Sequence, residues 1–253
     1  MRSLVQQFKF DVHREILRNL PFLFFSLLMP AGFYILFTKV MVSGTQSEMQ
    51  QFSGRYMVSM IVYSLIISAF FGLAALLQRD RRSGYLTRLS QTPVGLKAYY
   101  GSIAMCFMLM TVLSTGLMFV LAIGLNHVTL SIGQMLLILI VSLIGELPLF
   151  VISVLISRVQ REETLSVISN LLTFPVAIVS GLWWPLTMLP KWLQVVGKSM
   201  PTYRLNHLLN DIVADQSVSV YDWLVIMSWL VIALVAAMIW NLTLRRWQQG
   251  VTE

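Results

Sequence analysis

The apolar stretch YMVSMIVYSLIISAFFGLAALL, residues 56–77, decides what kind of protein this chain forms. It contains no charged residue, and a helix over it, at about 1.5 Å per residue, is long enough to cross the ~30 Å hydrocarbon layer of a bilayer. Similar runs predict further spans at 21–42, 99–125, 131–156, 165–185 and 222–243. The sequence therefore predicts an all-α membrane protein with six transmembrane helices.

The composition excludes an ordinary soluble domain. Hydrophobic residues make up 57% of the 253 residues and charged residues 11%, whereas about 25% of a typical globular chain is charged. The net charge of +7 would suggest nucleic acid as a partner of a soluble chain. In a membrane protein basic residues first report topology, because they collect in cytoplasmic loops. We therefore expect membrane lipid around this chain and no nucleic-acid partner.

The distribution of Lys and Arg predicts the orientation of the spans. Thirteen of the 18 basic residues lie on one side of a six-span chain, in the two terminal segments and in the loops at 78–98 and 157–164. The other side carries five, which are Lys39, Arg55, Lys191, Lys198 and Arg204. Because short basic loops stay inside the cell, both termini of this multi-pass protein are expected on the cytoplasmic side of the cell membrane.

The segment before the first span is amphipathic. Apolar residues recur every four positions over 4–20, whereas Asp11, Arg14, Glu15 and Arg18 fall largely on the opposite side. This pattern predicts a cytoplasmic helix lying in the membrane interface over 1–20, ahead of a six-span domain at 21–243 and a cytoplasmic tail at 244–253. The helix could be a positional anchor or a lever that touches a soluble partner, and its pattern leaves both open.

The connection between spans five and six is unusually apolar for a loop. Residues 174–209 contain four prolines, at positions 175, 185, 190 and 201, within a hydrophobic stretch. Short re-entrant helices would explain both features, because broken helices are tolerated at membrane depth where protein covers them. A proline-kinked fifth span followed by an interfacial belt of Trp183, Trp184 and Trp192 is the simpler reading, and both can hold.

The sequence offers no catalytic constellation. There is no H-E-x-x-H pair for a catalytic zinc, and the single cysteine, Cys106, can form neither an internal disulfide nor a Cys-based zinc site. Gly197-Lys198-Ser199 resembles the end of a phosphate-binding loop, but the glycine required five positions earlier is Trp192. We therefore predict no metal site, no cofactor and no ATPase site in this chain, and no enzyme activity of its own.

Glu146 is interpreted as the one carboxylate inside a predicted span, in the motif GELPLF of span four. An ionisable group in lipid is by default a functional candidate, so a proton relay in a secondary transporter is one reading. The other is a structural role beside the helix break at Pro148. With no second acid or histidine identified as a relay partner, the structural role is favoured.

Two motifs resemble one transporter family. The loop QRDRRSGYLTRLSQTPV at 78–94 resembles the first cytoplasmic loop of type-2 ABC exporter permeases, in which charged residues lead into Gly-Thr-Leu-Glu and then Thr-Pro-Val. The stretch 174–201, with its Phe-Pro, Trp-Pro-Leu and Leu-Pro pairs, is similar to the segment between spans five and six of that family. Two positions depart from the family pattern, since Tyr85 replaces Thr and Thr87 replaces Glu.

The resemblance implies partners and a coupling surface. Such a permease pairs with a second copy or close paralogue as a dimer and with two copies of a separate ABC ATP-binding subunit, on which ATP and Mg are bound. The family's coupling helix lies in the first cytoplasmic loop, with a minor contact in the second. Carried over to this chain, the coupling residues are Asp80, Arg81, Arg82, Gly84, Leu86, Leu89, Thr92, Pro93, Arg161 and Glu162.

The resemblance also implies a substrate path between two permeases, lined mainly by spans two and five. Candidates here are Tyr63, Phe70, Phe71, Asn170, Phe174 and Trp183. The expected function is outward, ATP-driven transport of an amphipathic drug, peptide or lipid-like molecule. A polysaccharide exporter of the same family is one alternative, and a proton-coupled secondary transporter that uses Glu146 is another from a different class.

Overall fold

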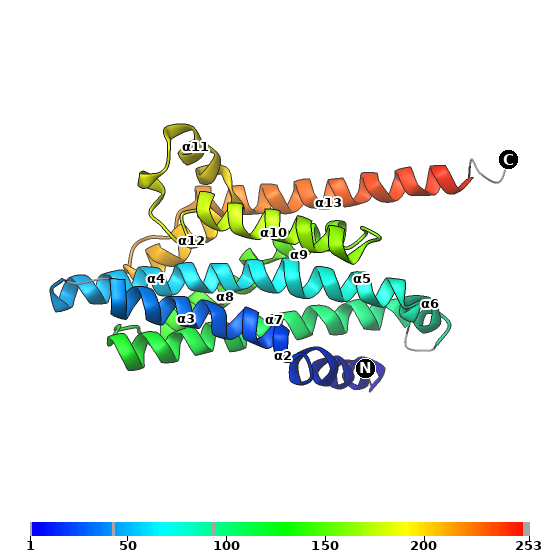
Figure 1. Ribbon diagram of the computed structural model, residues 1–253, viewed down its shortest axis with the longest axis horizontal. Helices are drawn as coiled ribbons and strands as arrows, with labels where there is room; N and C mark the ends of the chain where they lie inside the picture. Colours follow the sequence, from blue (N-terminus) through cyan, green and yellow to red (C-terminus); the bar gives the residue numbers. More distant parts are fainter. Residues whose placement is uncertain (1, 42–43, 93–94, 250–253) are drawn as a thin grey trace.

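The computed structural model describes residues 2–41, 44–92 and 95–249, and these residues form helices and connecting turns with no strand. Six helical segments are long and apolar enough to cross a membrane, which confirms the predicted fold class (Figure 1). They cover Leu20–Val40, Gln46–Arg82, Gly95–Asn126, Ile132–Ile156, Glu162–Val179 and Val220–Trp240.

Several spans are built from consecutive helical pieces. The N-terminal segment is α1 (Arg2–Asp11) and η1 (Val12–Leu17), and span one contains α2 (Leu20–Leu23), η2 (Phe24–Leu28), α3 (Met29–Leu36) and η3 (Phe37–Met41). Span two joins α4 (Gln46–Ile67), η4 (Ser68–Leu73) and α5 (Ala74–Arg82). The remaining helices are α6 (Tyr85–Ser90), α7 (Gly95–Asn126), α8 (Ile132–Gly145), α9 (Leu147–Ile156), α10 (Glu162–Val179), η5 (Leu186–Met188), α11 (Lys191–Ser199), α12 (Pro201–Val213) and α13 (Val220–Gln249).

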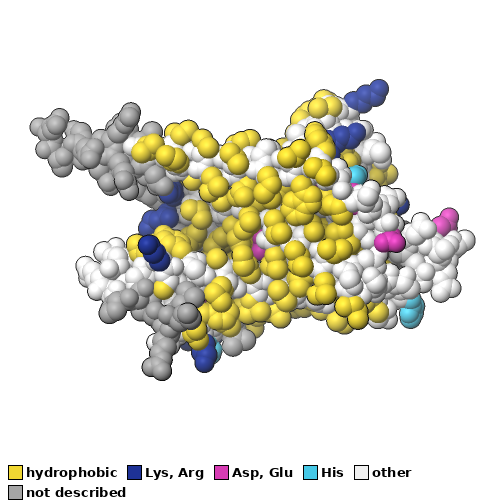
Figure 2. Space-filling model, turned by 180° about the vertical axis from the view of Figure 1, so that it is seen from behind, with side chains coloured by type: hydrophobic (Ala, Val, Ile, Leu, Met, Phe, Trp, Pro, Cys, Tyr) yellow, Lys and Arg dark blue, Asp and Glu magenta, His cyan; other side chains and the backbone are white. Residues whose placement is uncertain are grey.

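The bundle has two ends, which we name after the helices found there. Both described ends of the chain lie toward the α6 end, whereas α11 lies at the opposite, α11 end (Figure 1). The surface between them carries a broad apolar band, with charged side chains concentrated toward the two ends (Figure 2). Helix α13 continues through the predicted tail at 244–253 as far as Gln249, and 250–253 lie outside the described residues.

Span two forms the centre of the bundle. Helix α4 packs against α3, α7, α10 and α12, and the side chains of Met57, Ile61 and Leu65 are fully buried. Span six, by contrast, packs mainly along α9 and α12 and keeps most of its apolar side chains exposed. Exposed apolar residues are expected where a helix faces lipid, since lipid is as apolar as a leucine side chain.

Local sequence explains where helices begin and break. Thr45 and Ser131 form capping boxes with Glu48 and Gln134, which start α4 and α8. Pro148 cannot continue the hydrogen bonds of α8, and the chain restarts as α9 with Pro148 in its first turn. Gly84 adopts a positive φ of 69°, which allows the sharp turn from α5 into α6.

The N-terminal segment turns two of its acids toward the bundle. Helix α1 lies along α7, and Asp11 and Glu15 are buried, whereas Val5 and Phe10 are about half exposed. The two acids, which the sequence pattern places opposite the apolar residues, therefore contact the bundle. The reason is tertiary, because α5 and α7 present donor groups that the acids bind.

The segment between spans five and six folds into the short helices η5, α11 and α12. Helix α10 ends at Val179, before the predicted boundary at 185, and Gly181 turns the chain with a φ of 70°. Helix α12 packs into the bundle against α4, α8 and α13. Of the three tryptophans predicted to form a belt, Trp184 and Trp192 are exposed and Trp183 is half-buried.

Candidate functional site: an apolar cavity and a charged network at the α6 end

Asp80 is the centre of a charged network that joins three elements at the α6 end. Its Oδ2 atom accepts hydrogen bonds from Arg14 Nη2 at 2.7 Å and from Tyr99 Oη at 2.8 Å. Only 3% of Asp80 is exposed. A buried carboxylate is stable only when donors satisfy it, and here α7 and the N-terminal segment supply them. Asp80 therefore holds the end of span two in place.

Glu15 extends this network along the N-terminal segment. Its Oε1 atom lies 2.5 Å from Arg79 Nη2 and 2.6 Å from Arg14 Nε. Asp11, one turn away, accepts from Ser102 Oγ at 2.6 Å and from Gln7 Nε2 at 2.9 Å. The N-terminal helix is thus fixed to α5 and α7 by paired charges and hydroxyl groups.

Burial raises the pKa of both acids in the N-terminal segment. Loss of contact with water raises the pKa of Glu15, and the nearby Arg79 and Arg14 only partly offset this effect. Burial also raises the pKa of Asp11, although Ser102 and Gln7 donate to it. Both carboxyls therefore hold their protons more strongly in the folded protein than in an unfolded chain.

The first loop at the α6 end is tied to the second. Gln78 Nε2 donates to the carbonyl oxygens of Val159 at 2.6 Å and Arg161 at 3.1 Å. Arg81 Nη1 donates to Ser157 O at 3.1 Å, and Arg82 Nη1 lies 2.8 Å from Glu162 Oε1. The two loops that the family resemblance assigns to coupling therefore form one continuous surface.

The structure separates the predicted coupling residues into two groups. Asp80 and Leu89 are buried against the chain's own helices, so neither side chain is exposed at the surface of this chain. Leu86 is half-buried and packs on the core beside it. The exposed or half-exposed residues are Arg81, Arg82, Gly84, Thr92, Arg161 and Glu162, and Pro93 lies outside the described residues.

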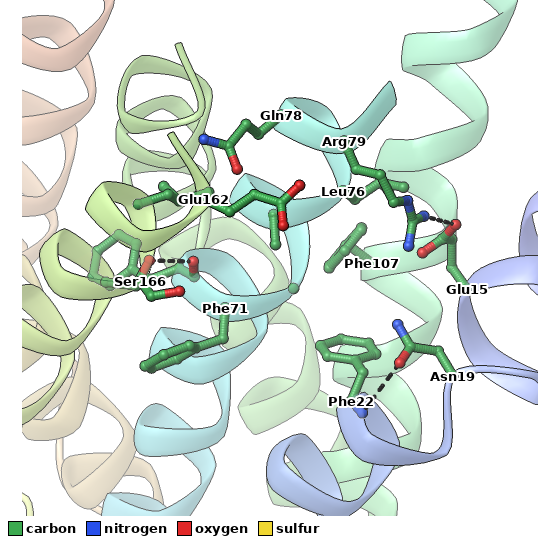
Figure 3. A pocket seen from close by; sticks show the side chains of 15 residues that line it. Glu15, Asn19, Phe22, Phe71, Leu76, Gln78, Arg79, Phe107, Glu162 and Ser166 are labelled. Carbon is green, nitrogen blue, oxygen red and sulfur yellow. Dashed lines mark hydrogen bonds and ion pairs between the residues drawn. The ribbon is translucent and has the colours of Figure 1, made fainter. Parts of the chain in front are cut away.

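A small cleft opens beside the charged network. It has a volume of about 250 Å³ and lies between the N-terminal segment, span two and α10. In Figure 3, Glu15 and Arg79 meet on one side of it, and Glu162 and Ser166 face it from α10. Phe22 and Phe71 line its apolar part (Figure 3). The cleft thus joins a charged rim to apolar walls.

An apolar cavity of about 480 Å³ lies between spans one, two and five. Four of the six predicted path residues line it, namely Tyr63 and Phe71 of span two and Asn170 and Phe174 of span five. Span one closes the cavity with Phe22, Phe25 and Met29, among others, which the sequence analysis did not include. Aromatic walls with few polar groups are typical of sites for apolar or amphipathic ligands.

The other two predicted path residues lie outside this cavity. Phe70 is 3% exposed, and its carbonyl oxygen accepts from Ser169 Oγ at 2.9 Å, so this hydrogen bond connects spans two and five. Trp183 joins an aromatic cluster, with ring centroids 5.3 Å from Tyr63 and 5.8 Å from Phe174. This cluster lies next to the cavity, because Tyr63 and Phe174 belong to both.

Glu146 lies at the break between α8 and α9 and is fully buried. Thr111 Oγ1 donates to its Oε2 atom at 2.6 Å, and no acid or histidine of the described residues is recorded as its partner. The interpretation of Glu146 as the one carboxylate within a span needs a correction. Asp222 stands at the first position of the predicted sixth span and is 1% exposed in α13.

The fold and these sites define a class of protein. Six apolar spans, an apolar cavity between three of them, and a joined loop surface at one end are features of a membrane permease.

Comparison with known proteins gives the family. The family model described as "ABC-2 type transporter" matches residues 6–213, so the chain belongs to the ABC-2 type transporter family as a permease subunit. The chain is also similar to a protein of Bacillus subtilis (strain 168) named "Putative transport permease YvfS". The two are 28% identical over 190 residues, which cover 75% of this chain and 77% of that protein.

Sequence reasoning missed the network around Asp80. It placed Arg14 and Glu15 opposite the apolar face of an interfacial helix and gave them no partner within the chain, because helical periodicity describes one helix alone. A usable signal was present, since Asp11 and Glu15 lie one turn apart, and Tyr99 and Ser102 place two hydroxyl groups on one side of the helix of span three. Their meeting depends on how α1 packs on α7, which periodicity does not specify.

Proposed function

We propose that this permease subunit works in an ATP-driven exporter that moves an amphipathic drug, peptide or lipid-like molecule outward across the cell membrane. A second permease and two separate ATP-binding subunits would complete the transporter, with ATP and Mg bound on those subunits. The loops at the α6 end would face the cytoplasm with both termini. The basic residues gathered in those segments support this orientation.

The observation that carries the proposal is the continuity of span two. One helical segment runs from Gln46 to Arg82, so the same element lines the apolar cavity with Tyr63 and Phe71 and ends in the charged network at Asp80. A movement imposed on α5 and α6 by a partner would therefore reach the cavity through one continuous helical segment.

The position of Asp80 and Leu89 gives them an indirect part in this proposal. Both are buried, so they would position α5 and α6 instead of contacting the ATP-binding subunit. Contact would fall to exposed side chains such as Arg88 and Thr92 and to the joined surface near Glu162.

Transport in vesicles tests the proposal. The permease is co-expressed with its proposed ATP-binding subunit, and uptake of the amphipathic dye rhodamine 6G into inverted vesicles is followed with ATP present. We expect Phe71→Ala and Phe174→Ala to lower uptake severalfold, because both rings line the cavity. Val231→Ala, which trims an exposed side chain on span six, is the matched control and should leave uptake unchanged.

The outcomes separate the candidate functions. Uptake that needs a proton gradient and persists without ATP would contradict the proposal and favour the secondary transporter that uses Glu146. ATP hydrolysis stimulated by a linear oligosaccharide, with no response to the dye, would favour the polysaccharide exporter. The buried carboxylate of Glu146 is the observation that keeps the first alternative open to test.

The orientation has its own test. In a Cys106→Ser background, Gln91→Cys and Gln216→Cys each place a single thiol on an exposed position, at the α6 end and in the loop before α13. An impermeant maleimide on intact cells should label position 216 and leave position 91 unlabelled. The reverse pattern would overturn the proposed topology.

A further inference from the structure

A histidine and two aspartates converge at the junction of α12 and α13. His207 and Asp211 lie one turn apart on α12, and Asp222 lies in the first turn of α13. His207 Nδ1 lies 2.9 Å from Asp222 Oδ2 and 3.3 Å from Asp211 Oδ2. One nitrogen and two oxygen atoms, from two helices joined by a short turn, therefore point at one position.

The distances from His207 Nδ1 to the two carboxylates are close to those between metal ligands, and all three groups offer atoms within 4.8 Å of one another. With metal–ligand bonds of about 2.0–2.1 Å, neighbouring ligands of a tetrahedral zinc ion lie about 3.3 Å apart. The two distances from His207 Nδ1 are close to this value without any movement of the backbone. A ring nitrogen has only one proton to share between the two carboxylates, whereas an ion at the centre would bind all three atoms.

The charges around the cluster favour a cation. Asp222 Oδ1 lies 2.8 Å from Arg204 Nη1, and this guanidinium is the cluster's one close basic partner among the described residues. Two carboxylates beside one arginine leave a net negative charge. Arg204 also holds the Asp222 carboxylate in place, as outer partners of metal ligands commonly do.

The cluster is buried on the side of the two aspartates and exposed on the side of His207. Asp222 is 1% exposed and Asp211 9%, whereas the His207 side chain is 48% exposed. The carboxylates are thus fixed by the protein, and the histidine side faces outward, where an ion could enter and a water molecule could complete its coordination.

We propose that His207 Nδ1, Asp211 Oδ2 and Asp222 Oδ2 form a binding site for Zn²⁺ or a similar divalent transition-metal ion. Imidazole nitrogen with two carboxylates suits Zn²⁺, whereas Ca²⁺ and Mg²⁺ prefer sites made of oxygen atoms alone. The bound ion connects α12, which packs inside the bundle, to the start of span six. This proposal does not depend on the transported substrate or on the direction of transport.

The sequence analysis predicted no metal site, because it searched for paired histidines or cysteines at close spacing. Asp211 and Asp222 are separated by the turn at 214–219, and their approach depends on how α13 packs against α12. Only the tertiary structure brings the third ligand to the other two.

Metal titration of the purified protein tests the site. The full chain is purified in nanodiscs through a tag that contains no histidine, stripped with a chelator, and titrated with Co²⁺ and with Zn²⁺. We expect one Co²⁺ per chain with the visible absorption bands of a tetrahedral site, displaced by Zn²⁺. Zn²⁺ should also raise the thermal unfolding temperature, because an ion bound only to the folded state stabilises it.

Matched variants identify the ligands. His207→Ala and Asp211→Asn should each weaken Zn²⁺ binding by at least tenfold and abolish the thermal shift. His127→Ala removes another exposed histidine that belongs to no such cluster among the described residues, and it should bind Zn²⁺ normally. Asp211→Asn nearly preserves the side-chain shape, so its unfolding temperature without metal shows whether the fold is intact.

Two results would overturn the proposal. One is a wild-type protein that takes up no stoichiometric Co²⁺ or Zn²⁺, which would leave the cluster as an ion pair between His207 and the acids. The other is normal Zn²⁺ binding by a folded Asp211→Asn or His207→Ala variant, which would place the ion elsewhere.

Discussion

The two ends of the bundle stabilise their buried acids in different ways. At the α6 end, the buried acids Asp11, Glu15 and Asp80 are paired with donors spread over three elements, and each acid has its own arginine or hydroxyl partner. At the α11 end, two acids converge on one histidine nitrogen. A distributed network holds helices at fixed positions, whereas a converging cluster leaves room for an ion.

The charged groups at the two ends also differ in their access to solvent. The α6-end acids are enclosed by α1, α5 and α7, so removal of a partner would leave a buried charge unpaired. The α11-end cluster is half open through His207. We therefore expect substitutions at the α6 end to act on folding and assembly first, and substitutions at the α11 end to act on metal binding first.

The largest effect is expected from Arg14→Met. It removes the arginine that pairs with both Asp80 and Glu15 and leaves their charges buried, which costs about 3 kcal/mol in comparable cases. Thermal unfolding in nanodiscs and recovery of the complex with the ATP-binding subunit measure it. Arg18→Met, the same change at an exposed position of the same segment, should cost little. Equal stability of the two variants would show that the network does not hold the N-terminal helix.

Gly197→Ala should disturb the α11 end. A methyl group at this position would collide with the carbonyl oxygen of Val179, so α11 could not keep its close approach to the end of α10. Overpacking of this kind costs about 1–3 kcal/mol. The readout is thermal unfolding, with Gly116→Ala as control, because open space surrounds position 116. A variant as stable as wild type would show that α11 is loosely packed, unlike the α6 end.

Glu146 is a buried acid that can be compared with those at the two ends. Thr111 Oγ1 donates a hydrogen bond to it. Glu146→Gln keeps a group that accepts this bond, so stability and transport should stay near wild type. Glu146→Ala leaves Thr111 unpaired and opens a small cavity, at a cost of about 1–3 kcal/mol. Unfolding temperature and dye uptake are compared for both variants. A Gln variant that folds normally and does not transport would support a proton-relay role.

The smallest expected effect is a pH dependence at the α6 end. Burial raises the pKa of Asp11 and Glu15 in the folded state, so the folded protein binds protons more tightly than the unfolded chain. Stability should therefore fall as pH rises from the ordinary carboxyl value of about 4 through the raised values, and it should recover on acidification.

Asp11→Asn isolates part of this dependence. It removes one of the two titrating groups while nearly keeping the side-chain shape, so the slope of unfolding temperature against pH should become shallower. His13→Gln, at an exposed position on the same segment, is the control. A slope of the opposite sign in the wild type would mean that the paired arginines, and not burial, dominate these two acids.

The sequence by itself determined the six spans, the short helices between spans five and six, and the membrane class. Each depends on local properties, because a run of apolar residues such as 56–77 must be helical in lipid, and Pro148 lacks the backbone N–H with which α8 would continue. Two motifs indicated the family. Because the resemblance pointed to spans two and five, four of the six predicted path residues line one cavity.

The tertiary structure alone decided which polar groups meet. Helical periodicity gave an apolar face to the N-terminal helix, but the packing of α1 on α7 turned Asp11 toward Ser102 and brought Arg14 to Asp80. The same holds for Asp222, which reaches His207 only because α13 starts beside α12. A buried charge is stabilised by partners distant in sequence, and their distance depends on helix packing, which no local pattern encodes.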